Sequence, residues 1–354
     1  MRRYLLAAIT AAVTVTAAGC VQAGAAVPGG RAAGSELWTA HLRTVTNTLS
    51  DAIAVSPHGG MVFVTGESYL GRADGAGYHT MAYRAATGRR LWASRYHGPT
   101  KGQDTPDAMT VSPDGTTVFV TGYSPSRGTG EDFATVAYRA ATGKQLWASR
   151  YNSPAHGYYA AKAVAMSPDG TAVYVTGMSR STRGAGFNYA TVAYNATTGN
   201  QLWASRYGPA KELGGAESIA VSPSGGRVFV TGRSFPRTSD PIYATVAYSA
   251  ATGRQMWASR YGPGKVFNDA NSVAVSPEGT SVFVTGTSDS DFATIAYNAA
   301  TGRQLWTGRD HGPGAGFGSA DWIVASPDGS TVFVTGWTQV STTRSEYLTI
   351  AYRS

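Results

Sequence analysis

One stretch of the sequence decides the fold: Ala108-Met-Thr-Val-Ser112, the turn Pro113-Asp-Gly115, then Thr117-Val-Phe-Val-Thr121, Phe133-Ala-Thr-Val-Ala-Tyr138 and Leu146-Trp-Ala-Ser-Arg-Tyr151. Its segments are short and rich in β-branched and aromatic residues, which favour strands. Turn residues separate them: proline presets the φ of a tight turn, aspartate bonds its own backbone, and glycine tolerates a left-handed exit. Four short strands in one unit are typical of a propeller blade.

The unit is repeated along the chain. Nothing in it has the 3.6-residue period of an amphipathic helix, and middle segments such as Val118-Phe119-Val120 are apolar on both faces, as a strand between two neighbouring sheets requires. The sequence therefore predicts an all-β fold, a six-bladed β-propeller with four antiparallel strands per blade. The tetrad Ser-Pro-x-Gly marks the copies, at intervals of 56, 55, 55, 54 and 50 residues, and begins at Ser56, Ser112, Ser167, Ser222, Ser276 and Ser326.

The two ends of the chain are complementary within this repeat. The chain stops at Ala351-Tyr-Arg-Ser354, which corresponds to the third strand of a blade, and Leu37-Trp-Thr-Ala40 matches the fourth-strand segment Leu146-Trp-Ala-Ser149. We expect the N-terminal strand to complete the last blade, because this removes an exposed sheet edge. Residues 37–354 then form one domain, and residues 27–36 form a flexible Gly/Ala-rich tether.

Residues 1–26 have the pattern of an export signal: a charged start, an apolar stretch and small residues after it. Cys20, the single cysteine of the chain, ends the apolar stretch in Ala17-Ala18-Gly19-Cys20. This resembles a bacterial lipobox, in which the cysteine is acylated and anchors the protein to a membrane, although lipoboxes prefer leucine where Ala17 stands. Ordinary cleavage near residues 23–25 is the alternative. The sequence predicts an exported protein, either a cell-surface lipoprotein or a secreted one.

Composition narrows the range of partners. The formal net charge is +8, but arginine and aspartate are interspersed and no run of like charge occurs. Since nucleic-acid binding usually needs a basic stripe, we expect no nucleic-acid partner. Because only one cysteine is present, we expect no disulfide in the mature fold, and its stability must come from packing. We expect a monomer.

A residue type present in every unit is expected to be structural. The recurrent tryptophans should pack adjacent blades together, since each buries about 150–250 Å². The arginines that follow three positions later should lie on the exposed outermost strand, where a cation discourages edge-to-edge association. The motif Gly-x-Ser after the second strand resembles half a nucleophile elbow and is interpreted as a strand exit. These tryptophans and arginines are Trp38, Trp92, Trp147, Trp203, Trp257, Trp306, Arg95, Arg150, Arg206, Arg260 and Arg309.

The units resemble the bacterial β-propeller repeats of the SBBP and YVTN types over residues 37–354. The stretch from Ala137 to Trp147 is also similar to the tryptophan-docking motif of quinoprotein (PQQ-like) dehydrogenases. That motif normally carries aspartate where Arg139 stands, and those enzymes have eight-bladed rings, often with a vicinal cysteine pair that this chain lacks. The resemblance implies blade packing, and pyrroloquinoline quinone is not expected as a cofactor.

Loop lengths indicate which face is functional. The turns between the first and second strands and between the third and fourth strands are tight and uniform, whereas the other connections are long and differ between copies. In a propeller the variable loops crowd one face, where a ligand would bind. Trp322 and Trp337, the two tryptophans outside the repeat, belong to this variable-loop face and are candidate ligand contacts.

Polar residues also begin the innermost strands of the six units. Five of the six are Asp, Glu or Asn, and together they could ring the channel with oxygen ligands for a small molecule or for a cation such as calcium. The alternative is that each caps a turn by bonding nearby backbone. Asp289 and Asp291 are a second, weaker calcium candidate. The six positions are Asp51, Asp107, Lys162, Glu217, Asn271 and Asp321.

No catalytic motif can be assembled from the sequence. The six histidines form no pair at metal-ligand spacing, and there is no Ser/His/Asp set, Walker loop, Rossmann fingerprint or zinc motif. We therefore expect a binding or interaction module that holds a protein, a glycan or a small molecule on the variable-loop face. The alternatives are an enzyme, either a quinoprotein-like dehydrogenase or a lactonase-like hydrolase, and a purely structural role in the envelope.

Overall fold

The computed structural model describes residues 35–41, 48–69, 75–100, 102–128, 130–152, 157, 159–180, 186–208, 213–236, 241–262, 268–312, 317–341 and 343–354. Within these residues the chain holds 23 strands and no helix. A helix long and apolar enough to cross a membrane is accordingly not found in this part of the chain. The predicted export segment with Cys20, most of the tether and most of the long connections lie outside the described residues.

The strands form six antiparallel sheets, numbered here in chain order. The first sheet contains β1 (Thr48–Val55), β2 (Met61–Tyr69), β3 (Ala76–Arg84) and β4 (Arg90–Tyr96); the second β5 (Thr105–Val111), β6 (Thr117–Ser126), β7 (Gly130–Arg139) and β8 (Gln145–Tyr151); the third β9 (Tyr159–Met166), β10 (Ala172–Arg180), β11 (Phe187–Asn195) and β12 (Gln201–Tyr207); the fourth β13 (Leu213–Val221), β14 (Arg227–Phe235), β15 (Ile242–Ser249) and β16 (Gln255–Tyr261); the fifth β17 (Asn268–Val275), β18 (Ser281–Ser288), β19 (Asp291–Asn298) and β20 (Gln304–Asp310); and the sixth β21 (Gly318–Ala325), β22 (Thr331–Ser341) and β23 (Arg344–Arg353).

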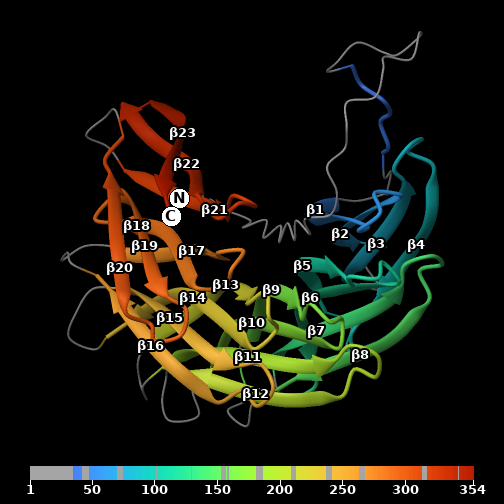
Figure 1. The fold of residues 1–354 in the computed structure, drawn as a ribbon. Helices are drawn as coiled ribbons and strands as arrows, with labels where there is room; N and C mark the ends of the chain where they lie inside the picture. The colour runs from blue at the N-terminus through green and yellow to red at the C-terminus, as the bar shows by residue number, and fades with distance from the viewer. Residues whose placement is uncertain are drawn as a thin grey trace.

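The sheets follow one another in space as they do along the chain. Within each sheet, strands adjacent in sequence are hydrogen-bonded neighbours, and the sixth sheet has three strands where the others have four. Figure 1 shows the sheets side by side along an arc, with the first strands on its inner side and the fourth strands on its outer side. Inner strands pack in chain order, from β1 on β5 to β17 on β21. Among the described residues β1 has no comparable packing against β21, so the first and sixth sheets are the ends of the arc.

The predicted turn chemistry is confirmed at each Ser-Pro-x-Gly tetrad. In the second sheet Gly115 has a φ of 71° and its N–H donates to the carbonyl of Ser112 at 2.8 Å. Asp114 Oδ1 accepts from the backbone N–H of Thr116 at 3.0 Å, and Ser112 Oγ accepts from that of Thr117 at 2.9 Å. The turn therefore satisfies its own backbone groups, which is why the same tetrad can be repeated with little change.

Tryptophan side chains join each sheet to the next, as predicted. The Nε1–H of Trp147, a residue only 9% exposed, donates to the carbonyl of Ala196 in the third sheet at 2.9 Å. Its ring lies 5.7 Å from that of Phe119 in its own sheet and 6.2 Å from that of Tyr194 in the next. One side chain thus contributes both apolar burial and a directed hydrogen bond to the interface between two sheets. The same bond joins Trp92 to Ala140, Trp203 to Ala250 and Trp257 to Ala299.

Residues 35–41 dock on the first sheet in the same way. Trp38 Nε1 donates to the carbonyl of Ala85 at 2.7 Å, and its ring stacks on that of Tyr83 at 6.2 Å. Relative to the first sheet, this segment therefore has the place of a fourth strand in a preceding sheet. In the described structure, however, it is not assigned as a strand and is not paired with β23, so the expected closure of the last blade is not observed as a hydrogen-bonded ladder.

The recurrent arginines lie on the outermost strands, as predicted, and Arg95, Arg260 and Arg309 are exposed, whereas Arg150 and Arg206 are partly buried. The Arg150 side chain is 21% exposed. It donates to Asp132 Oδ2 at 3.1 Å, to the carbonyl of Ser124 at 2.7 Å, and to the hydroxyl of Tyr96 in the first sheet at 3.1 Å. Arg309 makes the corresponding bond to the Ser288 carbonyl at 2.9 Å. Because a guanidinium offers five donors, Arg150 and Arg309 can tie the outer strand to the end of the second strand.

Candidate functional site

Each of the six polar residues predicted to begin an inner strand lies at a β-bulge. The register of the first two strands shifts at this residue in every sheet: for example, it shifts between Ser50 and Ala52 around Asp51, and between Ala216 and Ser218 around Glu217. A bulge inserts one residue that re-aims its side chain relative to the ladder. All six residues are partly buried on the inner side of the arc. The other bulged residues are Asp107, Lys162, Asn271 and Asp321.

The bulge explains the glycine of the Gly-x-Ser motif. Gly232 lies opposite the bulge at Glu217, and a Cβ built on it would overlap the carbonyl oxygen of Gly215. Gly66 has the same relation to the carbonyl of Leu49. The motif is therefore needed for close approach of two strands, and the interpretation as a strand exit accounts for only part of it. The serines of this motif are buried, at 0–3% exposure, in the five sheets that carry one.

Acidic and basic side chains from the first four sheets and β17 meet on this inner side. Lys162 Nζ forms an ion pair with Asp107 Oδ1 at 2.7 Å, and Arg233 Nη1 forms one with Asp269 Oδ2 at 3.2 Å. Glu67 is 5% exposed and accepts from the Gln103 amide at 2.9 Å and from Thr105 Oγ1 at 3.0 Å. We call the group of Asp51, Glu67, Asp107, Lys162, Glu217, Arg233 and Asp269 the axial cluster.

The axial cluster holds carboxyl groups with raised pKa values. Burial, followed by repulsion from Asp107 and Glu67, raises the pKa of Asp51 to about 7. Burial and the charge of Asp269 raise the pKa of Glu217 to about 7. Burial raises the pKa of Asp269 to about 6 although Arg233 opposes it. These groups therefore change charge near neutral pH, which is typical of functional sites but also occurs in structural networks.

Several carboxylate oxygens of the cluster have no hydrogen-bond donor in the part of the chain that the structure describes. Asp51 Oδ2, Asp107 Oδ2 and Asp269 Oδ1 are buried atoms without a hydrogen bond among the described residues. In the ionised form a carboxylate oxygen accepts hydrogen bonds only, so at pH values above the raised pKa values these atoms require donors. A buried acceptor left without a donor is costly, and such an atom calls for an explanation such as a bound molecule or ion. The turn-capping alternative does not supply a donor to these three atoms.

The remaining predicted positions form a separate hydrogen-bonded chain. Asn271 Nδ2 donates to Ser319 Oγ at 3.1 Å and to the carbonyl of Ala320 at 2.9 Å. Ser319 Oγ in turn donates to Asp321 Oδ1 at 2.8 Å. The structure thus joins Asn271 and Asp321 to each other, and joins Asp51, Asp107 and Glu217 electrostatically through Lys162.

The metal candidates are not assembled in the described structure. In the part of the chain that it covers, no three His, Cys, Asp or Glu residues are placed to hold a metal ion together. Asp291 accepts from Arg309 at 2.7 Å and from His311 Nδ1 at 2.6 Å, and Asp289 lies 3.6 Å from Arg309. The guanidinium of Arg309 contacts both aspartates, so the geometry of the pair is that of an ion-pair cluster.

Trp322 and Trp337 lie on one face of the sixth sheet. Trp337, on β22, lies on the same face of the sheet as Phe333, because alternate residues of a strand share a face. Its ring packs on that of Phe317 at 5.6 Å. Trp322, on β21, is adjacent to the buried Ile323 and therefore lies on the opposite face of the sheet from it. Both are partly buried, and neither belongs to the axial cluster. Sequence patterns identified them as exceptions to the repeat, but only the structure shows which face carries them.

Glu67, Arg233 and Asp269 were not predicted. Glu67 and Arg233 occupy the middle position of Gly-x-Ser, where the other sheets carry Tyr123, Met178 and other residue types. A repeat search discounts a position of this kind because nothing is shared there. The signal that could have found them is a charged residue at a strand position whose neighbours are apolar, since such a residue needs a partner when buried.

We expect the raised carboxyl pKa values to shape the pH dependence of stability. A group with a higher pKa in the folded state stays protonated longer when folded, so the free energy of unfolding should fall as pH rises from 3.8, the unfolded value, towards about 7. Asp51→Asn should reduce this fall, as measured by urea denaturation at several pH values. Asp328→Asn is the control of opposite sign: the pKa of Asp328 is lowered to about 2, so its contribution is lost as pH falls below 3.8. If Asp51→Asn left the pH profile of unfolding unchanged, the assigned burial of Asp51 would be wrong.

Known proteins share the fold at low sequence identity. A PQQ_2 family model, described as outer membrane protein assembly factor BamB, matches residues 27–191 and again residues 188–339. No curated protein matches the chain. Sqt1 of Chaetomium thermophilum, solved bound to the N-terminus of ribosomal protein L10, is similar with a TM-score of 0.55 and 14% identity over 81% of this chain and 68% of that chain. The periplasmic gluconolactonase of Pseudomonas aeruginosa is similar with a TM-score of 0.54 and 17% identity, over 84% of this chain and 87% of that chain. Quinohemoprotein alcohol dehydrogenase from Comamonas testosteroni is similar with a TM-score of 0.50 and 17% identity, over 81% of this chain and 56% of that chain.

Proposed function

Since the chain belongs to the PQQ_2 family, described as outer membrane protein assembly factor BamB, and is a β-propeller with PQQ-like repeats, we propose that it is an exported binding module that holds its ligand at the axial cluster. Family membership and the leader pattern support export, as a lipoprotein or as a secreted protein. Folds of this kind carry unrelated functions, so the proposal depends on the site and not on the fold.

One observation carries the proposal: three buried carboxylate oxygens of the axial cluster, on Asp51, Asp107 and Asp269, have no hydrogen-bond donor among the described residues. The three side chains come from different sheets, so a molecule on the inner side of the arc would contact several sheets at once. Convergence of a few polar groups from separate elements is typical of a ligand site.

Charge indicates the chemistry of the ligand. The cluster combines five carboxyl groups with two cationic side chains, in a chain whose formal net charge is +8. Above about pH 7, where the carboxyl groups of Asp51, Glu217 and Asp269 are mostly ionised, a locally acidic site in a basic protein attracts donors and cations rather than anions. We therefore favour a ligand rich in N–H or O–H donors, such as a protonated amine or a polyhydroxylated group, presented by a protein, a glycan or a small molecule.

The prediction that the six sheets form a closed six-bladed ring is part of this proposal. In a six-bladed monomeric ring the sixth sheet lies beside the first, and Asp321 comes next to Asp51 around the same axis. The site would then have six bulged residues in one ring, as the repeat implies. The supporting observations are that the sixth sheet has three strands among the described residues, and that segment 35–41 docks on the first sheet through Trp38.

Calorimetric titration of the mature chain, residues 27–354, tests the function. Spermidine, a lysine-rich peptide and a neutral oligosaccharide serve as donor-bearing probes. At least one should bind saturably, and Asp51→Asn should weaken it about tenfold or more, the value of one charge-assisted hydrogen bond. Glu278→Gln, which changes an exposed carboxylate on a turn, should bind as the unmodified chain does. Failure of every probe, or equal binding by Asp51→Asn, would contradict the proposal.

The enzymatic alternatives have a direct test of their own. Spectroscopic titration with pyrroloquinoline quinone and calcium, followed by assays with alcohols and with lactones, separates a dehydrogenase and a lactonase from a binding module. Saturable quinone binding with turnover of an alcohol, or hydrolysis of a lactone that Asp107→Asn abolishes, would replace the binding module by the corresponding enzyme. Neither activity is expected.

A further inference from the structure

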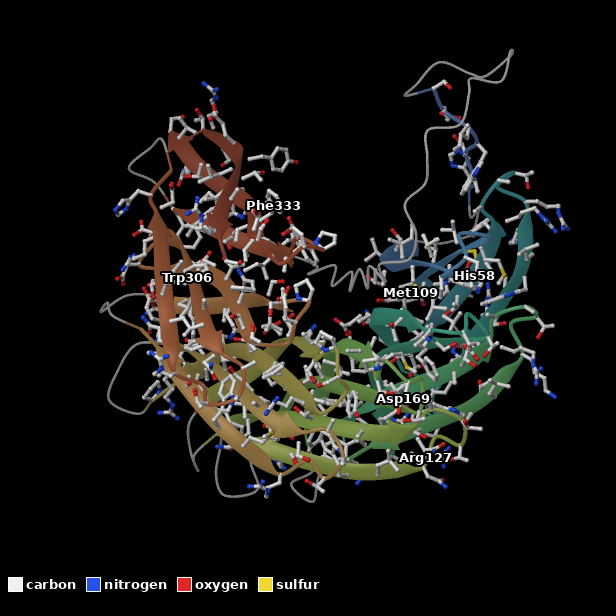
Figure 2. All side chains as sticks on the ribbon, in the orientation of Figure 1. His58, Met109, Arg127, Asp169, Trp306 and Phe333 are labelled. Atoms are coloured by element: carbon white, nitrogen blue, oxygen red, sulfur yellow. The ribbon has the colours of Figure 1, made fainter. Side chains whose placement is uncertain are left out.

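The two ends of the arc carry apolar faces of a kind that the interior sheets bury. On the first sheet Leu49, Ile53 and Val55 are 66%, 52% and 55% exposed. On the sixth sheet Val324 and Phe333 are 52% and 43% exposed. Figure 2 shows Phe333 on the side of the sixth sheet that faces towards the first. Apolar patches of this kind usually mark an interface.

Equivalent residues in the interior show what covers each face. Phe283, the counterpart of Phe333 in the fifth sheet, is fully buried in a cluster with Ala320 and Val332 of the sixth sheet. Val273, the counterpart of Ile53, is buried in a cluster with Phe229 of the preceding sheet. One end of the arc therefore lacks the sheet that should follow it, and the other lacks the sheet that should precede it.

Tyr347 of the sixth sheet is exposed, whereas its equivalents in interior sheets are buried and donate a hydrogen bond to the next sheet. Its ring is 94% exposed, whereas the equivalent Tyr189 and Tyr243 are 0–1% exposed. Tyr189 Oη donates to the carbonyl of Ala244 in the next sheet at 3.0 Å, and Tyr243 Oη donates to that of Ala293 at 3.3 Å. The position equivalent to Ala244 and Ala293 in the first sheet is His79. The carbonyl of His79 is thus the acceptor that the repeat assigns to Tyr347.

The middle residue of Gly-x-Ser contacts the inner strand of the next sheet. Glu67 accepts from Thr105 at 3.0 Å, and Arg233 donates to Asp269 at 3.2 Å. Trp337 is the sixth residue of this series, and the counterpart of Thr105 and Asp269 in the first sheet is Leu49. In a closed ring, an apolar pair of Trp337 and Leu49 would therefore stand where the interior sheets have a polar pair.

Trp322 has an equally specific counterpart. Ser218, which occupies the same position in the fourth sheet, accepts from the backbone N–H of Val273 in the fifth at 3.2 Å. The first-sheet equivalent of Val273 is Ile53, which is 52% exposed. A tryptophan at this position would cover that side chain. In a closed ring, both tryptophans that break the repeat would therefore face apolar residues of the first sheet.

The pairing of third and fourth strands in the other sheets predicts which residues of segment 35–41 and β23 would lie opposite each other. In every four-stranded sheet the tryptophan of the fourth strand lies opposite an alanine of the third, as Trp147 lies opposite Ala137. The same alignment places Trp38 opposite Ala351 and Thr39 opposite Ile350. The 23 described strands and segment 35–41 together make six sheets of four, with no segment left over.

We infer that the sixth sheet binds the first sheet of the same chain through an apolar seam, in which Trp337 covers Leu49, Trp322 covers Ile53 and residues 35–41 pair with β23. The inference deepens the closed ring proposed above, and it assigns the two tryptophans to closure and not to the ligand. The first sheet presents the matching face, and residues 35–41 supply the matching strand.

Disulfide trapping tests the occupant of the sixth sheet. Thr39→Cys with Ile350→Cys, in a mature chain without Cys20, places the two sulfur atoms on directly opposed residues, whose Cα atoms would lie about 4.5–5.5 Å apart, within the range of a disulfide. The control, Thr39→Cys with Thr349→Cys, moves one side chain to the other face of the strand. Oxidation should give an intramolecular disulfide in the first pair only. A disulfide between two chains would make a second copy the partner, and no disulfide, or equal yields in both pairs, would also overturn the inference.

A double-mutant cycle tests the tryptophan assignment separately from closure and ligand binding. Trp337→Ala and Leu49→Ala should each lower the melting temperature, and the double variant should lose less than the two losses together, because the two changes remove one contact. Trp337→Ala with Leu213→Ala is the matched control, since Leu213 is 45% exposed on the fourth sheet, and its losses should add. Additivity in both pairs would show that Trp337 does not contact Leu49. Because Asp51 is unchanged in these variants, their binding of the donor-bearing probes is measured as a separate result.

Discussion

Replacing Trp147 with alanine should lower the free energy of unfolding by about 3–5 kcal/mol, the range for a large aromatic side chain removed from a packed core. The ring is 9% exposed and packs between Phe119 and Tyr194, so the change opens a cavity between two sheets. It also leaves the carbonyl of Ala196 without the indole N–H that bonds it at 2.9 Å. Urea denaturation followed by far-UV circular dichroism measures the loss.

Leu146→Ala is the matched control for this change. Leu146 is the preceding residue on the same strand and is 39% exposed, so its truncation should change stability by less than about 1 kcal/mol. Equal losses for the two variants would mean that the tryptophan does not join the sheets.

Gly232→Ala should destabilise the protein by about 3 kcal/mol although it adds a single methyl group, because overpacking forces backbone to move. The new Cβ would overlap the carbonyl oxygen of Gly215, where the first strand bulges. The bulge can survive only if the two strands separate, and Glu217 would then be re-aimed. Thermal denaturation measures the first effect, and loss of probe binding measures the second.

Gly226→Ala separates this effect from the general cost of replacing glycine. Gly226 is in the turn between β13 and β14 of the same sheet, and a Cβ there would meet only Ser224 Oγ, at 3.8 Å. Its substitution should be nearly neutral. Similar melting temperatures for Gly232→Ala and Gly226→Ala would refute the account of the bulge.

The features that the sequence predicted correctly are local or repeated. A Ser-Pro-x-Gly turn satisfies its own backbone through Ser112 and Asp114, so its structure can be derived from a few residues. The packing of the tryptophans followed from their presence in every unit. The strand segments followed from the same repetition, because one pattern was seen six times.

Features that depend on contacts between different units were missed or misjudged. Arg150 was expected at an exposed edge, but its partners Asp132 and Tyr96 come from another strand and from another sheet. The ion pair of Arg233 and Asp269 joins residues 36 positions apart, and neither residue type recurs at its position in the other units. Propensity and spacing describe a strand but not the side chain that lies opposite it in the next sheet.

The candidate site was predicted in part. The positions of Asp51, Asp107 and Glu217 could be selected because they are equivalent in the repeat. Their placement at bulges, and the absence of donors for Asp51 Oδ2 and Asp107 Oδ2 among the described residues, required the packed structure. A bulge is a property of two paired strands, and no single segment of sequence specifies it.

Amide hydrogen exchange of β23 tests the closed ring most directly. If residues 35–41 pair with β23, the backbone N–H groups along both of its edges should exchange slowly in the mature chain. Deleting residues 35–41 should then release about half of them, since alternate N–H groups of a strand point to opposite neighbours. If the intact chain already exchanges those N–H groups as fast as the truncated one, the sixth sheet has no fourth strand and the closed ring is wrong.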